Sequence, residues 1–213
     1  MIKQLYLFLF SFIIIIVSCN NSKQAEPVSN PPGYDLGKPE KYIMPDVLLE
    51  ISGIAFRNGN ADTLYAQQDE EGKVFALAPG QKKNRETRFG KRGDYEDIAI
   101  ANGYVFLLRS DGTIFSFPEA ELQSDHAGTV KEWEGLLPKG EFEGMYADTA
   151  AHLLYVLCKQ CSEDKGSTMV TGYTLRLGTD SMLVRDAAFS INSDLIFEKA
   201  EKKKGRKQRF QPS

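Results

Sequence analysis

Acidic side chains recur at two fixed positions along this chain of 213 residues. One position is occupied by Ser52, then by Glu96 44 residues later and by Glu143 a further 47 residues on. The other position lies two residues earlier in each stretch. Carboxylates that converge from several segments make an oxygen-rich nest, and Ca²⁺ takes about six to eight oxygen ligands. The spacing therefore predicts a calcium site built from the acidic members of the two positions, which are Glu50, Asp94, Glu96, Glu141 and Glu143.

Two arrangements of these acids remain open. In the first, Glu96 and Glu143 face a shared axial site that Ser52 completes, and Asp94 is either a further ligand or a residue that caps the loop. In the second, each acid accepts backbone N–H bonds in the loop where it lies and binds no metal. Residues two apart on a strand share a face, but the earlier residue of each pair can lie in the preceding loop.

Cys158 and Cys161 form a C-x-x-C pair. A redox motif of this spacing is typical of a thioredoxin-like βαβ context, whereas here the pair follows a strand-like run. A local disulfide that tightens a turn, two free thiols, and a zinc half-site or redox pair are the three alternatives. The chain holds 3 cysteines in all and therefore offers no second pair to complete a zinc site.

The elements that must position these residues recur as well. The stretches EISGIAF (50–56), DYEDIAI (94–100) and EFEGMYA (141–147) align, and each precedes two runs rich in Val, Leu, Tyr and Phe. Those two runs are joined by a turn containing an acid and a glycine, as in a hairpin. A weaker fourth run ends each unit, at ETRF, TVKEWEG and SMLVRDAAFSI.

Four strands in about 45 residues is the period of a β-propeller blade. The predicted fold class is therefore all-β, with three four-stranded blades and a stub at RFQPS. The inner strands should be apolar on both faces, because neighbouring blades cover them. An open arc of blades would leave edges exposed. We therefore expect the sequence to be truncated from a five- or six-bladed ring, the alternative being that other copies complete the ring.

The N-terminal segment is set apart from the fold. Lys3 precedes the apolar run Leu5–Val17, which is shorter than the roughly 20 residues of a membrane span. Ile16-Val17-Ser18-Cys19 resembles the bacterial lipobox, which implies cleavage before Cys19 and its acylation, for example with palmitate. The predicted organisation is a lipoprotein signal peptide at 1–18, a flexible tether at 19–41 and the propeller domain at 42–213. An uncleaved anchor helix is the alternative.

Charge and leader together limit the possible partners. The formal net charge is -3, from 26 basic and 29 acidic residues, so the composition does not predict a nucleic-acid-binding surface. The expected location is the cell envelope, with the protein lipid-anchored to a bacterial membrane. Asn20 after Cys19 favours the outer membrane, facing the periplasm.

The motifs also resemble a known family. LEISGIAF, TLYAQQDEEGKVFAL, GDYEDIAI, VFLLRSDGTIFSF, FEGMYAD and LLYVLCK, between Leu48 and Lys159, are similar in order and separation to the SdiA-regulated family of bacterial propellers. That family more distantly resembles NHL-repeat propellers. The resemblance implies a small propeller with a calcium ion at a shared site and no known enzyme activity.

The leading functional hypothesis is a membrane-tethered binding module with calcium at its axial mouth and an unknown small-molecule or protein ligand. A metal-dependent hydrolase resembling sugar lactonases is the second hypothesis, although a hydrolase needs a base beside its metal and no dedicated base is evident. The third is a structural interaction scaffold without a bound ion.

Overall fold

The computed structural model describes residues 30–178 and 182–199. The predicted signal peptide and Cys19 lie outside these residues. The chain divides into two units between Lys41 and Tyr42, which is where the tether is predicted to end. Within the first unit, residues 30–41 contain turns and exposed side chains but neither helix nor strand.

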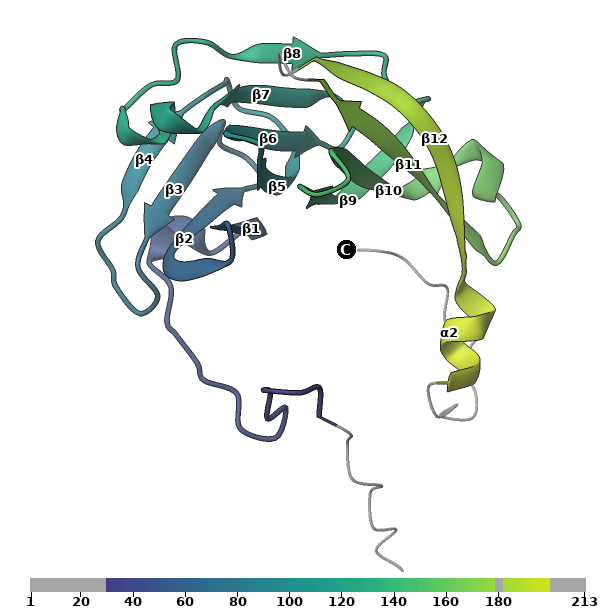
Figure 1. The fold of residues 1–213 in the computed structure, drawn as a ribbon, viewed down its shortest axis with the longest axis horizontal. Coiled ribbons are helices and arrows are strands. Elements are labelled where there is room, and N and C mark those ends of the chain that lie inside the picture. The colour runs from purple at the N-terminus through teal and green to yellow at the C-terminus, as the bar shows by residue number, and fades with distance from the viewer. Residues whose placement is uncertain (1–29, 179–181, 200–213) are drawn as a thin grey trace, which may run out of the picture. The chain divides into compact units, whose positions relative to one another are not determined.

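The second unit contains three sheets of four strands, and each sheet follows the chain in order. All neighbouring strands within a sheet are antiparallel (Figure 1). The predicted four-stranded blades of an all-β, propeller-type fold are therefore confirmed. The first sheet is β1 (Ile51–Arg57), β2 (Asn60–Gln68), β3 (Lys73–Leu77) and β4 (Arg85–Arg88). The second is β5 (Tyr95–Ala101), β6 (Tyr104–Arg109), β7 (Ile114–Pro118) and β8 (Lys131–Trp133). The third is β9 (Gly140–Asp148), β10 (Leu153–Cys161), β11 (Met169–Leu177) and β12 (Leu183–Asn192).

Short helical turns complete the unit. They are η1 (Asp46–Leu48), η2 (Glu119–Gln123), η3 (Ser162–Asp164) and the helix α2 (Ser193–Lys199). No helix in the described ranges is long and apolar enough to cross a membrane.

Two of the hairpins turn at Asn-Gly pairs, whose residues adopt the positive φ that a tight hairpin of this kind requires. Asn58 and Gly59 have φ of 48° and 71° between β1 and β2. Asn102 and Gly103 have φ of 52° and 78° between β5 and β6. The local sequence therefore sets these two turns and the strand pairing that follows from them.

Apolar cores lie between successive sheets, and the middle sheet is covered on both faces. In β6, alternate side chains enter the two cores and none is more than 1% exposed: Val105, Phe106, Leu107 and Leu108. The first core contains side chains from the first two sheets, including Tyr65, Val74, Phe89, Ile98, Phe115 and Phe117. The second joins the second and third sheets through Ile114, Phe142, Leu154, Val156, Tyr173 and Leu175.

The inner strands of the other two sheets differ from expectation. They were predicted to be covered on both faces, but Ile54 of β1 is 53% exposed and Tyr146 of β9 is 65% exposed. The physical reason is that, among the described residues, each of these sheets packs against another sheet on one face. A smaller cluster beneath η1, with Leu48 and Phe75, covers part of the free face of the first sheet.

Candidate functional site

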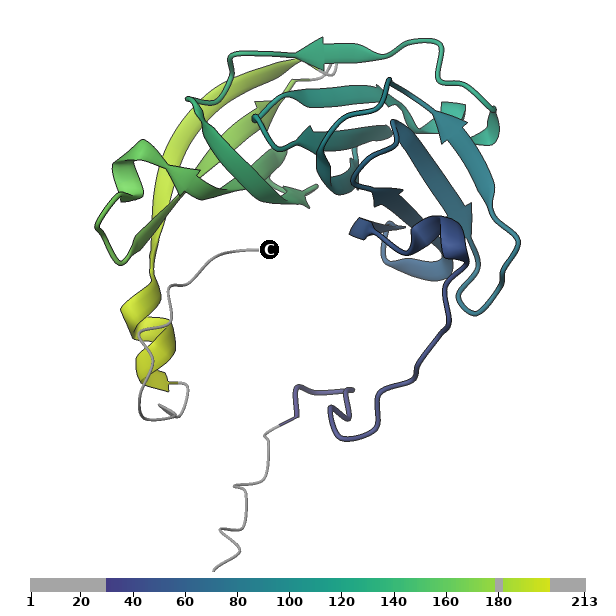
Figure 2. The same cartoon turned by 180° about the vertical axis from the view of Figure 1, so that it is seen from behind.

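The first strands of the three sheets lie side by side, with β5 contacting both β1 and β9 (Figures 1 and 2). Each carries a β-bulge at the same repeat position. The register skips Ser52 between Ile51 and Gly53, Glu96 between Tyr95 and Asp97, and Glu143 between Phe142 and Gly144. A bulge re-aims the side chain of the extra residue and often lies next to a functional site. The residues that the sequence aligned therefore share an irregular backbone feature.

The start of each later inner strand is tied to the preceding sheet by the same backbone relay. A residue in the turn of one sheet donates its N–H to the carbonyl that begins that sheet, and its own carbonyl accepts the N–H of the next inner strand. The first relay consists of Asp69 N–H to Glu50 O (3.2 Å) and Tyr95 N–H to Asp69 O (2.7 Å). The second consists of Ser110 N–H to Asp94 O (2.9 Å) and Phe142 N–H to Ser110 O (2.8 Å).

Glu96 lies in a concentrated negative field. Burial, and then the negative charges of Glu143 and Asp94, together raise the pKa of Glu96 from the ordinary 4.5 to about 7. Asp69 adds to the effect, whereas the ammonium of Lys159 opposes it. The structure therefore brings Glu96 and Glu143 within electrostatic reach of each other, and burial together with these charges favours the protonated form of Glu96.

Lys159 neutralises the two acids contributed by the third sheet. Its Nζ lies 3.0 Å from Glu141 Oε1 and also pairs with the carboxylate of Glu143. Hydrogen bonds to Glu143 and then to Glu141 hold the pKa of the Lys159 ammonium above its usual range. Glu143 is well shielded, with 12% of its side chain exposed, so this ion pair is more than a surface contact.

The two remaining predicted ligands are Asp94, whose charge acts on Glu96, and Glu50. Glu50 and Asp94 are exposed, and it is their backbone carbonyls that take part in the relay between sheets. Ser52 is also exposed. Within the part of the chain that the structure describes, no group of three or more His, Cys, Asp or Glu side chains is arranged to hold a metal ion.

Asp97 is a site residue that the sequence reasoning missed. Its carboxylate accepts the N–H of Met145 in the third sheet (2.6 Å) and its neighbouring N–H from Ile98 (2.8 Å). On the other side it lies against Gly53 of the first sheet, where a β-carbon would come within 2.7 Å of Asp97 Oδ1. One carboxylate thus joins three sheets, and burial raises its pKa to about 6. The sequence does contain a signal for it, because Asp97 stands at the repeat position where the other two copies have glycine, Gly53 and Gly144.

Two polar groups near these strands have no hydrogen-bond partner among the described residues. Gln67, which is paired with Gly53 in the β1–β2 ladder, is 0% exposed, and neither atom of its amide is bonded. Oδ1 of Asp69 is likewise buried and unpartnered. Buried polar groups are nearly always satisfied, so such groups point to an ordered water or ion.

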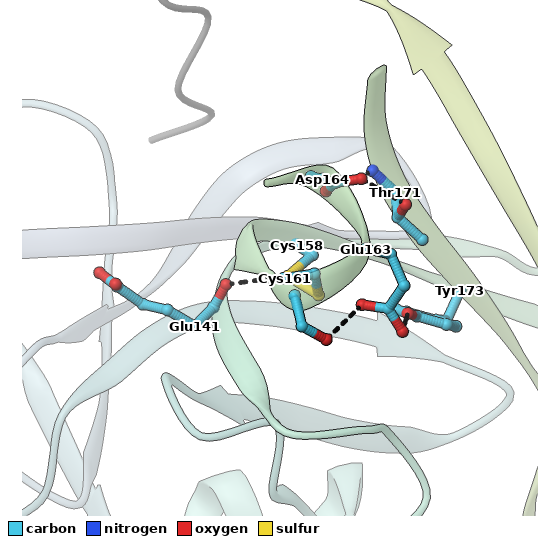
Figure 3. The surroundings of a disulfide bond; sticks show 8 residues. Glu141, Cys158, Cys161, Glu163, Asp164, Thr171 and Tyr173 are labelled. Carbon is cyan, nitrogen blue, oxygen red and sulfur yellow. Dashed lines mark hydrogen bonds between the residues drawn. A yellow bond between two sulfur atoms is a disulfide. The ribbon is translucent and has the colours of Figure 1, made fainter. Parts of the chain in front are cut away.

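A disulfide joins Cys158 and Cys161, which is one of the three alternatives considered from the sequence. Both cysteines are buried, and the sulfurs pack where Gly140 has no side chain. The ring that the disulfide closes contains Lys159, at a point where the β9–β10 register shifts. The turn η3 follows directly, and Figure 3 shows the disulfide beside it and beside the backbone of Glu141.

The same turn is fixed from its other side by a buried carboxylate. Asp164 accepts hydrogen bonds from the N–H of Thr171 (2.9 Å) and from its hydroxyl (2.6 Å), as Figure 3 also shows. Disulfide and carboxylate together restrict the segment that carries Lys159 toward Glu141 and Glu143.

Comparison with known proteins gives only distant structural similarity. No protein-family model matches the chain, and no curated protein matches it significantly. A luciferin-regenerating enzyme has 16% identity and a TM-score of 0.42, over 63% of this chain and 44% of its own. The designed protein Ika4 has 13% identity and a TM-score of 0.41, over 64% and 71%. Hsv2 of Kluyvelomyces marxianus has 12% identity and a TM-score of 0.41, over 65% and 46%.

This chain therefore spans less than half the length of the luciferin-regenerating enzyme. The resemblance to the SdiA-regulated family stays a prediction.

Proposed function

We propose that the unit beginning at Tyr42 is a propeller-type binding module that holds a cation, calcium, where its inner strands begin. The observation that carries the proposal is the repeated bulge, which sets Ser52, Glu96 and Glu143 apart from the regular ladder in three consecutive sheets. A device that recurs at one repeat position and re-aims a side chain each time is more than local irregularity.

The electrostatics support a cation at this place. Glu96 experiences the charges of Glu143, Asp94 and Asp69, and Lys159 is the cation that opposes them. Because Lys159 is already shared by Glu141 and Glu143, it leaves negative charge around Glu96 uncompensated. A bound cation would favour the ionised form of Glu96 and offset the cost of burying it.

The described residues match calcium in their charge and in their oxygen donors, but they supply fewer oxygen ligands than calcium usually has. Glu96 and the unpartnered Oδ1 of Asp69 are hard oxygen donors of the kind calcium prefers. The usual complement is about six to eight oxygens, so the rest would come from water or from groups outside the described residues. A site with few protein charges is expected to bind weakly, with a Kd on the order of 10⁻⁴–10⁻³ M, as in extracellular modules.

Thermal unfolding of the full chain in EDTA and in calcium tests the proposal. Calcium at about ten times its Kd adds about 1.4 kcal/mol to the free energy of unfolding, which for this chain length is about 3–6 °C in Tm. Glu96→Gln should abolish the shift, whereas Glu134→Gln, which alters an exposed acid, should retain it. No shift in the unsubstituted chain, or an equal shift in Glu96→Gln, would overturn the calcium assignment.

A hydrolase is the second candidate, and one observation favours it. A carboxyl whose pKa is about 7 is suited to act as a general base at neutral pH, and Glu96 meets that condition. A panel of lactones and phosphoesters tests this candidate, assayed in EDTA, where Glu96 keeps its raised pKa, and again with calcium present. Turnover that Glu96→Gln removes would support it, and an inactive panel would leave the binding module as the function.

We further propose that a lipid on Cys19 anchors the module to the periplasmic face of the outer membrane. The lipobox-like Ile16–Cys19 and the polar segment after it support this location. Mass spectrometry of the mature N-terminus should find an acylated cysteine, and Cys19→Ala should yield a chain that is neither acylated nor cleaved before residue 19. An unmodified Cys19 in a membrane-bound chain would instead indicate an uncleaved anchor helix.

A further inference from the structure

A second place on the module has the features of an anion site. It lies at the last strand of the first sheet, whereas the acids described above lie where the first strands begin. We propose that the groove around β4, between the first and second sheets, binds a phosphate-bearing polar ligand. The groove has a volume of about 1040 Å³, slightly above the range typical of small-molecule sites. The groove is lined in part by Thr63, Lys83, Arg85, Arg88, Gln123 and His126.

The groove is bordered by a basic segment. Residues 82–92 include six basic side chains and a single acid, Glu86. That acid is paired with Lys73 at 2.9 Å, and Lys73 also pairs with Glu71 at 2.9 Å. Lys83 and Arg85 are exposed and have no carboxylate partner among the described residues. Asp125 is the other acid at the groove, so positive charge exceeds negative charge there.

Hydrogen bonds between the two sheets hold the walls of the groove in place. Thr87 Oγ1 donates to Ser124 O at 2.8 Å, and Arg88 N–H donates to Asp125 O at 2.9 Å. In return, Arg88 O accepts the N–H of Ala127 at 2.8 Å. The backbone of residues 125–127 thus continues the first sheet beyond β4, and ligand groups would meet a pre-formed wall rather than a free strand edge.

Arginine presents paired N–H donors whose geometry matches phosphate oxygens, and lysine adds a compact charge. The guanidinium of Arg85 is oriented across the groove by Gln123, whose amide oxygen accepts its hydrogen bond. Lys83 is two residues away. The groove is much larger than a phosphate ion, so the phosphate group is expected to be borne by a larger polar molecule. A free phosphate ester and an anionic phospholipid headgroup share this chemistry.

The test titrates the full chain, held in neutral-detergent micelles and in EDTA, with glycerol 3-phosphate and separately with micelles containing phosphatidylglycerol. Calorimetry measures binding, and EDTA keeps calcium out of the result. Lys83→Gln/Arg85→Gln should weaken binding at least tenfold. Lys139→Gln/Lys165→Gln removes the same charge from exposed positions elsewhere and should bind as the unsubstituted chain does.

Binding of glycerol 3-phosphate would identify a site for free phosphate esters, and binding confined to phosphatidylglycerol micelles would identify a headgroup site. Absence of both, or equal weakening by the two double variants, would overturn the proposal. Circular dichroism of both double variants verifies that they are folded. Because calcium is absent throughout, these outcomes are independent of the calcium assignment.

Discussion

Replacing Asp97 by asparagine should reduce the dependence of stability on pH, to which Glu96, whose pKa is also raised, contributes as well. The folded protein raises the pKa of Asp97 from 3.8 to about 6, because burial disfavours its charged form more than two backbone N–H donors favour it. The folded state therefore holds the proton more tightly than the unfolded state does. As the pH falls through 6, this carboxyl adds to the free energy of unfolding, and the gain is complete below about 3.8.

The size of the effect follows from the two pKa values. Between pH 7.5 and pH 5, proton linkage for one group with these values gives about 1.4 kcal/mol. For a chain of this length that free energy corresponds to about 3–6 °C in Tm. Asparagine has nearly the same shape, so Asp97→Asn should preserve the close approach to Gly53 while removing the titration. Its NH₂ group cannot accept an N–H, so one of the two backbone hydrogen bonds is lost and Tm should fall at both pH values.

The assay is thermal unfolding of the full chain in EDTA, followed by circular dichroism at both pH values. The quantity of interest is the change in Tm between pH 7.5 and pH 5, compared between the unsubstituted chain and Asp97→Asn, since other titrating groups are common to both. Asp62→Asn, at an exposed position, is the matched control and should behave as the unsubstituted chain. If Asp97→Asn shows the full pH dependence, the burial argument for this carboxyl is wrong.

Two further predictions concern how the site is held together. Gly53→Ala should lower the free energy of unfolding by about 1–3 kcal/mol in a denaturant titration, because its β-carbon would lie 2.7 Å from Asp97 Oδ1 and 2.8 Å from Asp97 Cα. Gly128→Ala has open space and should cost little, and equal losses would count against the contact. Cys158→Ser/Cys161→Ser should lower the free energy by about 2 kcal/mol, the chain-entropy value for so short a ring. A reductant should have the same effect on the unsubstituted chain and none on the double variant, and a double variant as stable as the oxidised chain would contradict this.

The fold was largely predictable because its information is local and repeated. The stretches 50–56, 94–100 and 141–147 were predicted to begin the repeats, and the structure places β1 at Ile51–Arg57, β5 at Tyr95–Ala101 and β9 at Gly140–Asp148. Apolar runs and turn residues determine each strand and hairpin without reference to distant parts of the chain. The alignment of three copies then made each weak local signal stronger.

The candidate site was predictable only in part. The repeat placed Glu96 and Glu143 at one position, and in the structure both occupy the bulge position of their strands. It could not show that Lys159 would neutralise Glu143 and Glu141, since that contact depends on a shifted register in β10. It also passed over Asp97, which has no acidic counterpart in the other copies.

By itself, the sequence determined the strands, their grouping in fours and the recurrence of acids at the strand starts. The tertiary structure decided which of those acids share a field, which are neutralised and which lie exposed. The physical reason is that strand formation follows from neighbours along the chain, whereas the charge state of a carboxyl follows from the groups and the burial around it. The position of the Asp97 carboxylate, for example, depends on Gly53 in the preceding sheet and on the N–H of Met145 in the following sheet.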